Sequence, residues 1–84
     1  MPLSPPQRLT KAREAKGFSM ARLAAILALS GIRGAQASRI CLWESEGSDA
    51  EPKVGQLLAL SRVLGVTTDW LSGASDKGGP KVDA

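Results

Sequence analysis

The sequence predicts an all-α fold of five short helices, and three observations support this. Apolar residues recur at spacings of three and four along most of the chain, as on the buried face of a helix. Clusters of glycine, proline and serine separate these segments, and such residues begin and end helices. No segment alternates between apolar and polar residues in the manner of a strand. The 84 residues are enough for one domain with a small core.

The first helix is predicted to begin after Ser4 and to run to about Lys16. Serine is a favoured N-cap, and Pro5 and Pro6 follow at the positions where a helix tolerates proline best. Gly17 is expected to end the helix, because glycine readily adopts the left-handed conformation found after a last turn.

The second helix is predicted over residues 20–28. Ser19 is its expected N-cap, and Phe18 precedes the cap at the position of a hydrophobic staple. The apolar face of this helix consists of Met20, Leu23, Ala24 and Leu27.

The third helix is predicted over residues 35–45, after a turn at 29–34 that contains two glycines. Ile40 and Trp43 are three residues apart and are expected to anchor this helix in the core. Two short amphipathic helices joined by a glycine-containing turn are typical of a helix-turn-helix, whose second helix enters the major groove of DNA. The pattern is weak evidence alone, since any small helical bundle contains such a pair.

The last two helices follow a loop at 47–52. The fourth is predicted over residues 53–64 and ends at Gly65, and the fifth over 69–72, capped by Thr67 or Thr68. The apolar stripe of the fourth helix consists of Val54, Leu57, Leu58, Leu60, Ser61 and Leu64. Residues 74–84 show no apolar pattern, so we expect a domain over 1–73 and a flexible C-terminal tail over 74–84.

Charged residues are unevenly distributed along the chain. Residues 1–39 contain seven Lys and Arg side chains and one acidic side chain, whereas residues 40–51 contain four acidic side chains and no basic one. A basic segment favours a polyanion such as DNA as a partner. Charge alone leaves a solvated basic surface as an equal alternative.

Several classes of protein are disfavoured by composition. The chain has no histidine and one cysteine, Cys41, which excludes disulfide frameworks and the usual zinc sites and suits a reducing cytoplasm. We interpret Cys41 as a small apolar residue on a helix. The first residues do not form a signal peptide, and the longest apolar stretch, Leu23–Leu29, has only 7 residues, too few to span a membrane. We expect a soluble cytoplasmic protein without cofactor or metal.

An enzyme is the disfavoured alternative. Paired carboxylates among Glu44, Glu46, Asp49 and Glu51 could in principle act as acid and base. There is no histidine, metal-ligand spacing or glycine-rich phosphate loop beside them, so no catalytic residue is assigned.

Five short motifs occur in the order and spacing of one known family. They are Arg8-Leu9 with Arg13, Lys16-Gly17-Phe18-Ser19, Leu23-Ala24 with Leu27, Ile40-x-x-Trp43-Glu44, and the segment 64–73 (LGVTTDWLSG). Residues 8–73 thereby resemble the lambdoid phage repressor and Cro family of helix-turn-helix proteins, often called the Xre family. The resemblance implies a five-helix lambda-repressor-like DNA-binding domain.

The chain departs from the family pattern in the turn before the third helix. Ala28 and Ile40 are 12 positions apart, so about six residues are inserted around Ser30–Ala35 compared with the tight turn of the motif. The turn is therefore extended, and Gly34 and Ala35 fit either this turn or the first turn of the third helix. Met20 also replaces a glutamine that usually contacts phosphate in the family.

The resemblance implies that the third helix contacts bases. Arginine pairs well with guanine and glutamine with adenine, so Arg39 and Gln36 are the favoured polar base contacts, with phosphate or solvent as the alternative for Arg39. The base-contacting candidates, outward from Ile40 and Trp43, are Gln36, Ala37, Ser38, Arg39 and Leu42. The phosphate-contacting candidates are Gln7, Arg8, Ser19, Arg22, Arg33, Ser48 and Lys53.

Two structural roles also follow from the resemblance. Glu44 is expected to form an ion pair with Arg13 that fixes the third helix against the first. Val66, Trp70 and Leu71 are candidates for a homodimer interface. The alternative is that Trp70 only closes the core of a monomer.

The sequence therefore predicts a DNA-binding transcriptional regulator, most simply a phage or prophage-type repressor that binds a palindromic operator in double-stranded DNA as a homodimer. Two alternatives remain open. The same fold can serve as a protein-interaction module, or it can be the antitoxin of a toxin–antitoxin pair with a protein partner.

Overall fold

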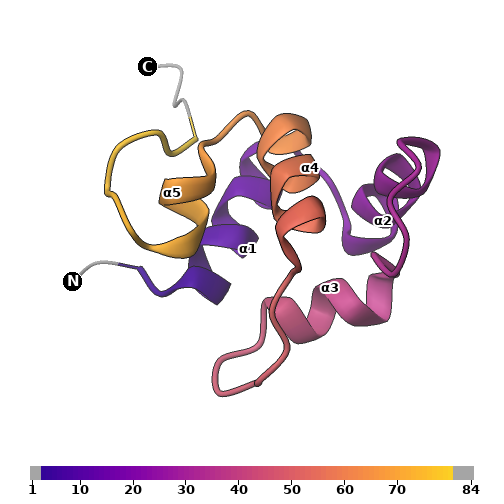
Figure 1. Ribbon diagram of the computed structural model, residues 1–84, viewed down its shortest axis with the longest axis horizontal. Helices are drawn as coiled ribbons and strands as arrows, with labels where there is room; N and C mark the ends of the chain where they lie inside the picture. The colour runs from indigo at the N-terminus through magenta and orange to yellow at the C-terminus, as the bar shows by residue number, and fades with distance from the viewer. Residues whose placement is uncertain (1–2, 81–84) are drawn as a thin grey trace.

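Five helices enclose one core in a computed structural model that describes residues 3–80 (Figure 1). The helices are α1 (Pro5–Ala15), α2 (Met20–Leu29), α3 (Ala37–Trp43), α4 (Val54–Leu64) and α5 (Thr68–Ser72). No strand occurs within residues 3–80, so the described part of the chain is all-helical, as predicted. The Cα radius of gyration is 11.7 Å, close to the value of about 12 Å expected for a compact domain of this length.

Side-chain caps determine where three of the helices begin. The Ser4 hydroxyl accepts a hydrogen bond from Gln7 N, and the Gln7 side chain accepts one from Ser4 N at 3.0 Å, which completes a capping box. Ser19 Oγ accepts from Arg22 N at 3.0 Å at the start of α2. Thr67 Oγ1 accepts from Trp70 N at 3.1 Å, so Thr67 and not Thr68 caps α5.

The core draws on all five helices and on two connecting segments. Ile40 and Trp43 are buried, as their spacing predicts, and Ala35 and Val66 join the core from outside the helices. The buried apolar side chains among the described residues are Leu9, Ala12, Leu23, Leu27, Ala35, Ile40, Trp43, Leu60, Leu64, Val66, Trp70 and Leu71. Two members of the predicted stripe on α4 are instead exposed, Val54 at 76% and Leu58 at 47%, because α4 packs on α2 and α5 through its Leu60–Leu64 side.

The third helix is shorter than predicted. It was expected over 35–45, but it spans Ala37–Trp43, with Gln36 as N-cap and Glu44 as C-cap. Gly34 has a φ of +77°, in the left-handed region that favours glycine, and this directs the next side chain, Ala35, into the core. Ala35 therefore belongs to the inserted turn.

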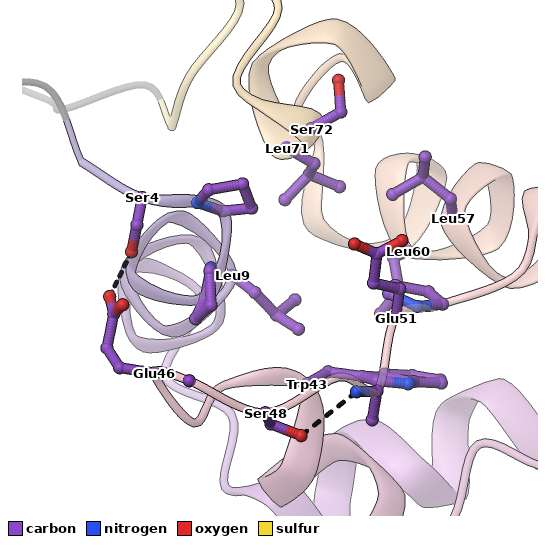
Figure 2. Close-up of a pocket in the computed structure, with 15 residues that line it drawn as sticks. Ser4, Leu9, Trp43, Glu46, Ser48, Glu51, Leu57, Leu60, Leu71 and Ser72 are labelled. Carbon is purple, nitrogen blue, oxygen red and sulfur yellow. Dashed lines mark hydrogen bonds between the residues drawn. The ribbon is translucent and has the colours of Figure 1, made fainter.

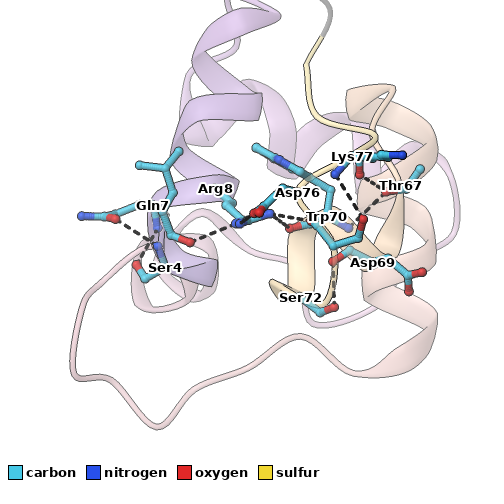
Figure 3. A network of polar contacts seen from close by, with 11 residues as sticks. Ser4, Gln7, Arg8, Thr67, Asp69, Trp70, Ser72, Asp76 and Lys77 are labelled. Carbon is cyan, nitrogen blue, oxygen red and sulfur yellow. Dashed lines mark hydrogen bonds and ion pairs between the residues drawn. The ribbon is translucent and has the colours of Figure 1, made fainter. Parts of the chain in front are cut away.

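The segment 74–80, expected to be part of a flexible tail, folds back against α1 and α5 (Figure 3). Thr67 N donates to Gly78 O at 3.0 Å, and Arg8 donates to Ser75 O at 2.8 Å. Most of these contacts are made by main-chain atoms of the segment. They could not be predicted from apolar patterns, because such patterns describe side chains only. Residues 81–84 of the expected tail lie outside the described residues.

No helix within residues 3–80 is long and apolar enough to cross a membrane. The longest of them, α1 and α4, have 11 residues each.

Candidate nucleic-acid interface

The end of α3 is fixed to α1 by a bidentate ion pair between Arg13 and Glu44. Arg13 Nε lies 2.7 Å from Glu44 Oε2, and Arg13 Nη2 lies 2.9 Å from Glu44 Oε1. Thr10 Oγ1 donates a further hydrogen bond to Glu44 Oε1 at 2.8 Å, and Arg13 Nη1 donates to Phe18 O at 2.7 Å. The side chains are 12% and 4% exposed, so the pair is shielded from water. It orients α3 more than it stabilises the fold.

This arrangement keeps Arg13 charged. Hydrogen bonding to Glu44 raises the pKa of Arg13 above its usual value, and this outweighs the opposite effect of burial. Arg13 is therefore a structural cation and does not compete for an external anion.

One face of α3 is open to solvent. Ser38, Arg39 and Leu42 are exposed, with Leu42 at 46%, while Ile40 and Trp43 hold the opposite face in the core. Of the other base-contacting candidates, Gln36 is exposed at the N-cap and Ala37 is half-buried. Cys41, interpreted from the sequence as a small apolar residue, is also exposed on α3.

The inserted turn between α2 and α3 is anchored at three points. Ile32 packs against the core, Ala35 is buried, and the side-chain amide of Gln56 on α4 donates to Arg33 O at 2.9 Å. The Arg33 side chain itself is exposed. The turn therefore presents Arg33 from a fixed main-chain position.

The turn, α3 and the start of α4 surround a hollow of about 600 Å³. Arg33, Arg39 and Lys53 line this basic hollow, with Glu51 as its acidic member. None of the three cations forms an ion pair within residues 3–80. Three predicted DNA contacts thus lie around one concave surface, each with its charge available to an external anion.

Arg8, one of the predicted phosphate contacts, is buried and not free to meet a phosphate. It is 3% exposed, and its guanidinium donates to Leu3 O, Trp70 O, Ser75 O and Asp76 Oδ1 at 2.7–2.9 Å (Figure 3). The guanidinium carbon lies 5.2 Å from the centre of the Trp70 ring. A guanidinium with these partners holds α1, α5 and the segment 74–80 together and has little surface left for phosphate.

The predicted dimer residues Val66, Trp70 and Leu71 are also placed differently. Their exposures are 6%, 6% and 4%, and the segment 74–80 covers part of Trp70. Side chains this deeply buried offer almost no area to a second copy, so they serve the core of the monomer, which was the alternative for Trp70.

The remaining phosphate candidates are separated from the basic hollow or have other hydrogen bonds. Ser19 and Arg22 are exposed at the start of α2, and α2 packs against α3. The Gln7 side chain completes the capping box of α1. Ser48 Oγ accepts from Ala50 N at 3.2 Å in the loop after α3 and lines a different cavity.

Two residues that position this surface were missed from the sequence. Thr10 lies three residues before Arg13 on the same helical face, and this spacing could have linked it to Glu44. Gln56 offered no such signal, because its partner is a main-chain carbonyl 23 residues away in an inserted turn. No group of three His, Cys, Asp or Glu side chains that could hold a metal lies within residues 3–80.

The chain has no match among models of protein families, curated proteins or solved structures.

Proposed function

We propose that this protein is a sequence-specific DNA-binding transcriptional regulator of the lambda-repressor-like helix-turn-helix type, with α3 as its recognition helix. The basic hollow carries the proposal, because three cations without an ion-pair partner in residues 3–80 gather at the exposed face of α3. The motifs shared with the Xre family support the same function. They further favour a phage or prophage-type repressor that occludes a promoter.

Each part of the surface has a distinct role in this proposal. Arg39 on α3 pairs with the O6 and N7 atoms of guanine in the major groove. Arg33 and Lys53, whose main chains are joined by the Gln56 amide beside α3, contact phosphates and set the position of the helix. Leu42 offers an apolar contact to a thymine methyl group.

Two copies on a palindromic operator are part of the proposal. A helix of 7 residues makes few base contacts, and small modules reach specificity by reading two half-sites about one helical turn apart. The proposed dimer must form through a surface other than Val66, Trp70 and Leu71, because these side chains are buried.

Selection from a pool of random duplex DNA at several salt concentrations tests the proposal. We expect a palindromic sequence to be enriched by the wild-type protein and to be lost or relaxed with Arg39→Ala. The matched control is Arg62→Ala, since Arg62 is exposed in the last turn of α4, about 14 Å along the helix from Lys53. The control variant should select the wild-type sequence.

Two results would contradict this proposal. Enrichment of the same site by wild type and Arg39→Ala would remove Arg39 from base recognition and move it to Gln36 or the inserted turn. No enrichment at any salt concentration would remove DNA binding itself and favour the protein-interaction alternative.

A further inference from the structure

A second cavity, of about 490 Å³, lies between the start of α1, the loop after α3, and the helices α4 and α5 (Figure 2). Its walls are mainly apolar and include Leu9, Trp43, Leu57, Leu60 and Leu71. A hollow of this volume with apolar walls and a few polar groups is typical of a small-molecule site.

The charged side chains of this cavity are acidic. Glu46 and Glu51 both line it, and Lys, Arg and His are absent from the described residues around it. Glu46 is held by a hydrogen bond from the Ser4 hydroxyl. Glu51 forms no hydrogen bond or ion pair with any residue in 3–80, and Figure 2 shows its side chain extending from the loop over the cavity. A carboxylate that has no partner in the described part of the chain and lies over apolar walls favours a cationic ligand with an apolar body.

We propose that this acidic cavity binds a small organic cation, an ammonium group attached to an apolar body. The ammonium group lies beside the Glu51 carboxylate, and the body packs on Leu57 and Leu71. An anion of the same shape is rejected because it would meet the like charge of Glu51. A neutral analogue keeps the apolar contacts but loses the charge pairing.

The position of Glu51 gives this site a regulatory consequence, which rests on the proposed DNA-binding function. Glu51 and Trp43 line both the acidic cavity and the basic hollow. The negative charge of Glu51 therefore lies beside the surface proposed to meet phosphates, where it opposes binding. A bound cation neutralises this charge, so the ligand should strengthen DNA binding, as a corepressor does.

Binding can be tested without DNA, by nuclear magnetic resonance of the full chain. The probes are phenethylamine, 2-phenylethanol and phenylacetate, which share a body and differ in charge. The chain has two tryptophans, and only Trp43 lines the cavity. We expect millimolar phenethylamine to shift the indole N–H signal of Trp43 and the methyl signals of Leu57 and Leu71, while the signal of Trp70 stays in place.

Variants identify the charge that matters. Glu51→Gln should weaken phenethylamine binding by about fivefold, whereas Glu14→Gln, an exposed acid on α1, should leave it unchanged. Equal binding of 2-phenylethanol, or undiminished amine binding by Glu51→Gln, would overturn the selection of a cation. Absence of shifts with all three probes would overturn the site itself.

A DNA titration then tests the coupling. Phenethylamine should tighten binding of the selected duplex by about threefold, and Glu51→Gln should bind more tightly without amine and respond little to it. If the amine binds but the affinity for DNA stays constant, the regulatory role is wrong. If no duplex is selected, the proposed function fails, while the magnetic resonance result still decides on the ligand site.

Discussion

The side-chain amide of Gln56 on α4 bonds to the main-chain carbonyl of Arg33, 2.9 Å away in the inserted turn. The other end of the Gln56 amide, Oε1, accepts from Lys53 N at 2.8 Å at the start of α4. One side chain thus links the turn before α3 to the first turn of α4. It connects the main chains of two proposed phosphate-contacting residues, and it explains how an extended turn can hold a fixed shape.

Gln56→Glu should loosen the turn without removing the helix cap. The carboxylate keeps an acceptor for Lys53 N but has no donor for Arg33 O, so amides 31–35 should show faster motion in ¹⁵N relaxation. The loss should cost about 1 kcal/mol in unfolding free energy. Gln7→Glu is the matched control, since it also keeps its cap acceptor and has no donor contact with the turn. Unchanged relaxation of the turn in Gln56→Glu would show that Ile32 and Ala35 alone hold it.

Glu44→Gln should be the most destabilising single substitution on the α1–α3 contact. The Glu44 side chain is 4% exposed, and removing its charge leaves Arg13 buried without a counter-ion. We expect a loss of roughly 3 kcal/mol, measured by urea unfolding. Thr10→Val removes only one hydrogen bond to the same carboxylate and should cost about 1 kcal/mol. Equal costs for the two variants would contradict a dominant role for the ion pair.

The pH dependence of the same contact follows from the raised pKa of Arg13. A base whose pKa is higher in the folded state contributes stability that is complete below its unfolded pKa and is lost as pH rises through its folded pKa. For arginine both values lie far above neutrality, so this contribution should stay constant between pH 7 and pH 10. In urea unfolding over this range, the free-energy difference between wild type and Arg13→Met should therefore not change. A difference that narrows toward pH 10 would contradict this.

The sequence predicted the parts of the fold that depend on local rules. Ser4, Ser19 and Thr67 cap helices because the hydroxyl of an N-cap residue accepts a hydrogen bond from a main-chain N–H three residues later. Such local contacts can be predicted from the sequence. Ile40 and Trp43 were predicted to be buried from their spacing alone. The Glu44–Arg13 pair required the family resemblance, because no rule of spacing joins residues 31 positions apart.

The errors share a physical cause. Arg8 was assigned to phosphate because the resemblance implies contacts near the start of the first helix. Its side chain is instead buried, and it donates to the main-chain carbonyls of Trp70 and Ser75, more than 60 residues away. The segment 74–80 has no apolar pattern and packs through its glycines and carbonyls, which hydrophobic patterning does not register. Predictions from periodicity therefore succeeded for most helix faces, with Val54 and Leu58 on α4 as exceptions, and failed where the main chain supplies the contact.

Gly79→Ala and Gly55→Ala should change stability in opposite directions. A Cβ at Gly79 would lie 2.8 Å from atoms of the Trp70 ring, so the segment 74–80 must shift, at a cost of about 1 kcal/mol or more. A Cβ at Gly55 meets nothing within 4 Å and lies inside α4, so the higher helix propensity of alanine should add about 0.5–1 kcal/mol. Thermal unfolding should separate the two by roughly 8 °C. A neutral Gly79→Ala would show that the segment does not pack on Trp70.

The salt dependence of DNA binding distinguishes phosphate contacts from base contacts. Each phosphate contact releases about one counterion, so Arg33→Ala or Lys53→Ala should each lower the slope of log K against log salt by about 0.9. Both variants should weaken all duplexes alike, because phosphates carry no sequence information. Arg39→Ala should instead relax the choice of base at one position in each half-site and should change the slope less. Fluorescence anisotropy with the selected duplex and a scrambled duplex at four salt concentrations measures both effects. A slope unchanged by Arg33→Ala would mean that the inserted turn does not reach the DNA backbone. Arg33 has no ion-pair partner within residues 3–80, so no internal ion pair could mask the loss of its charge.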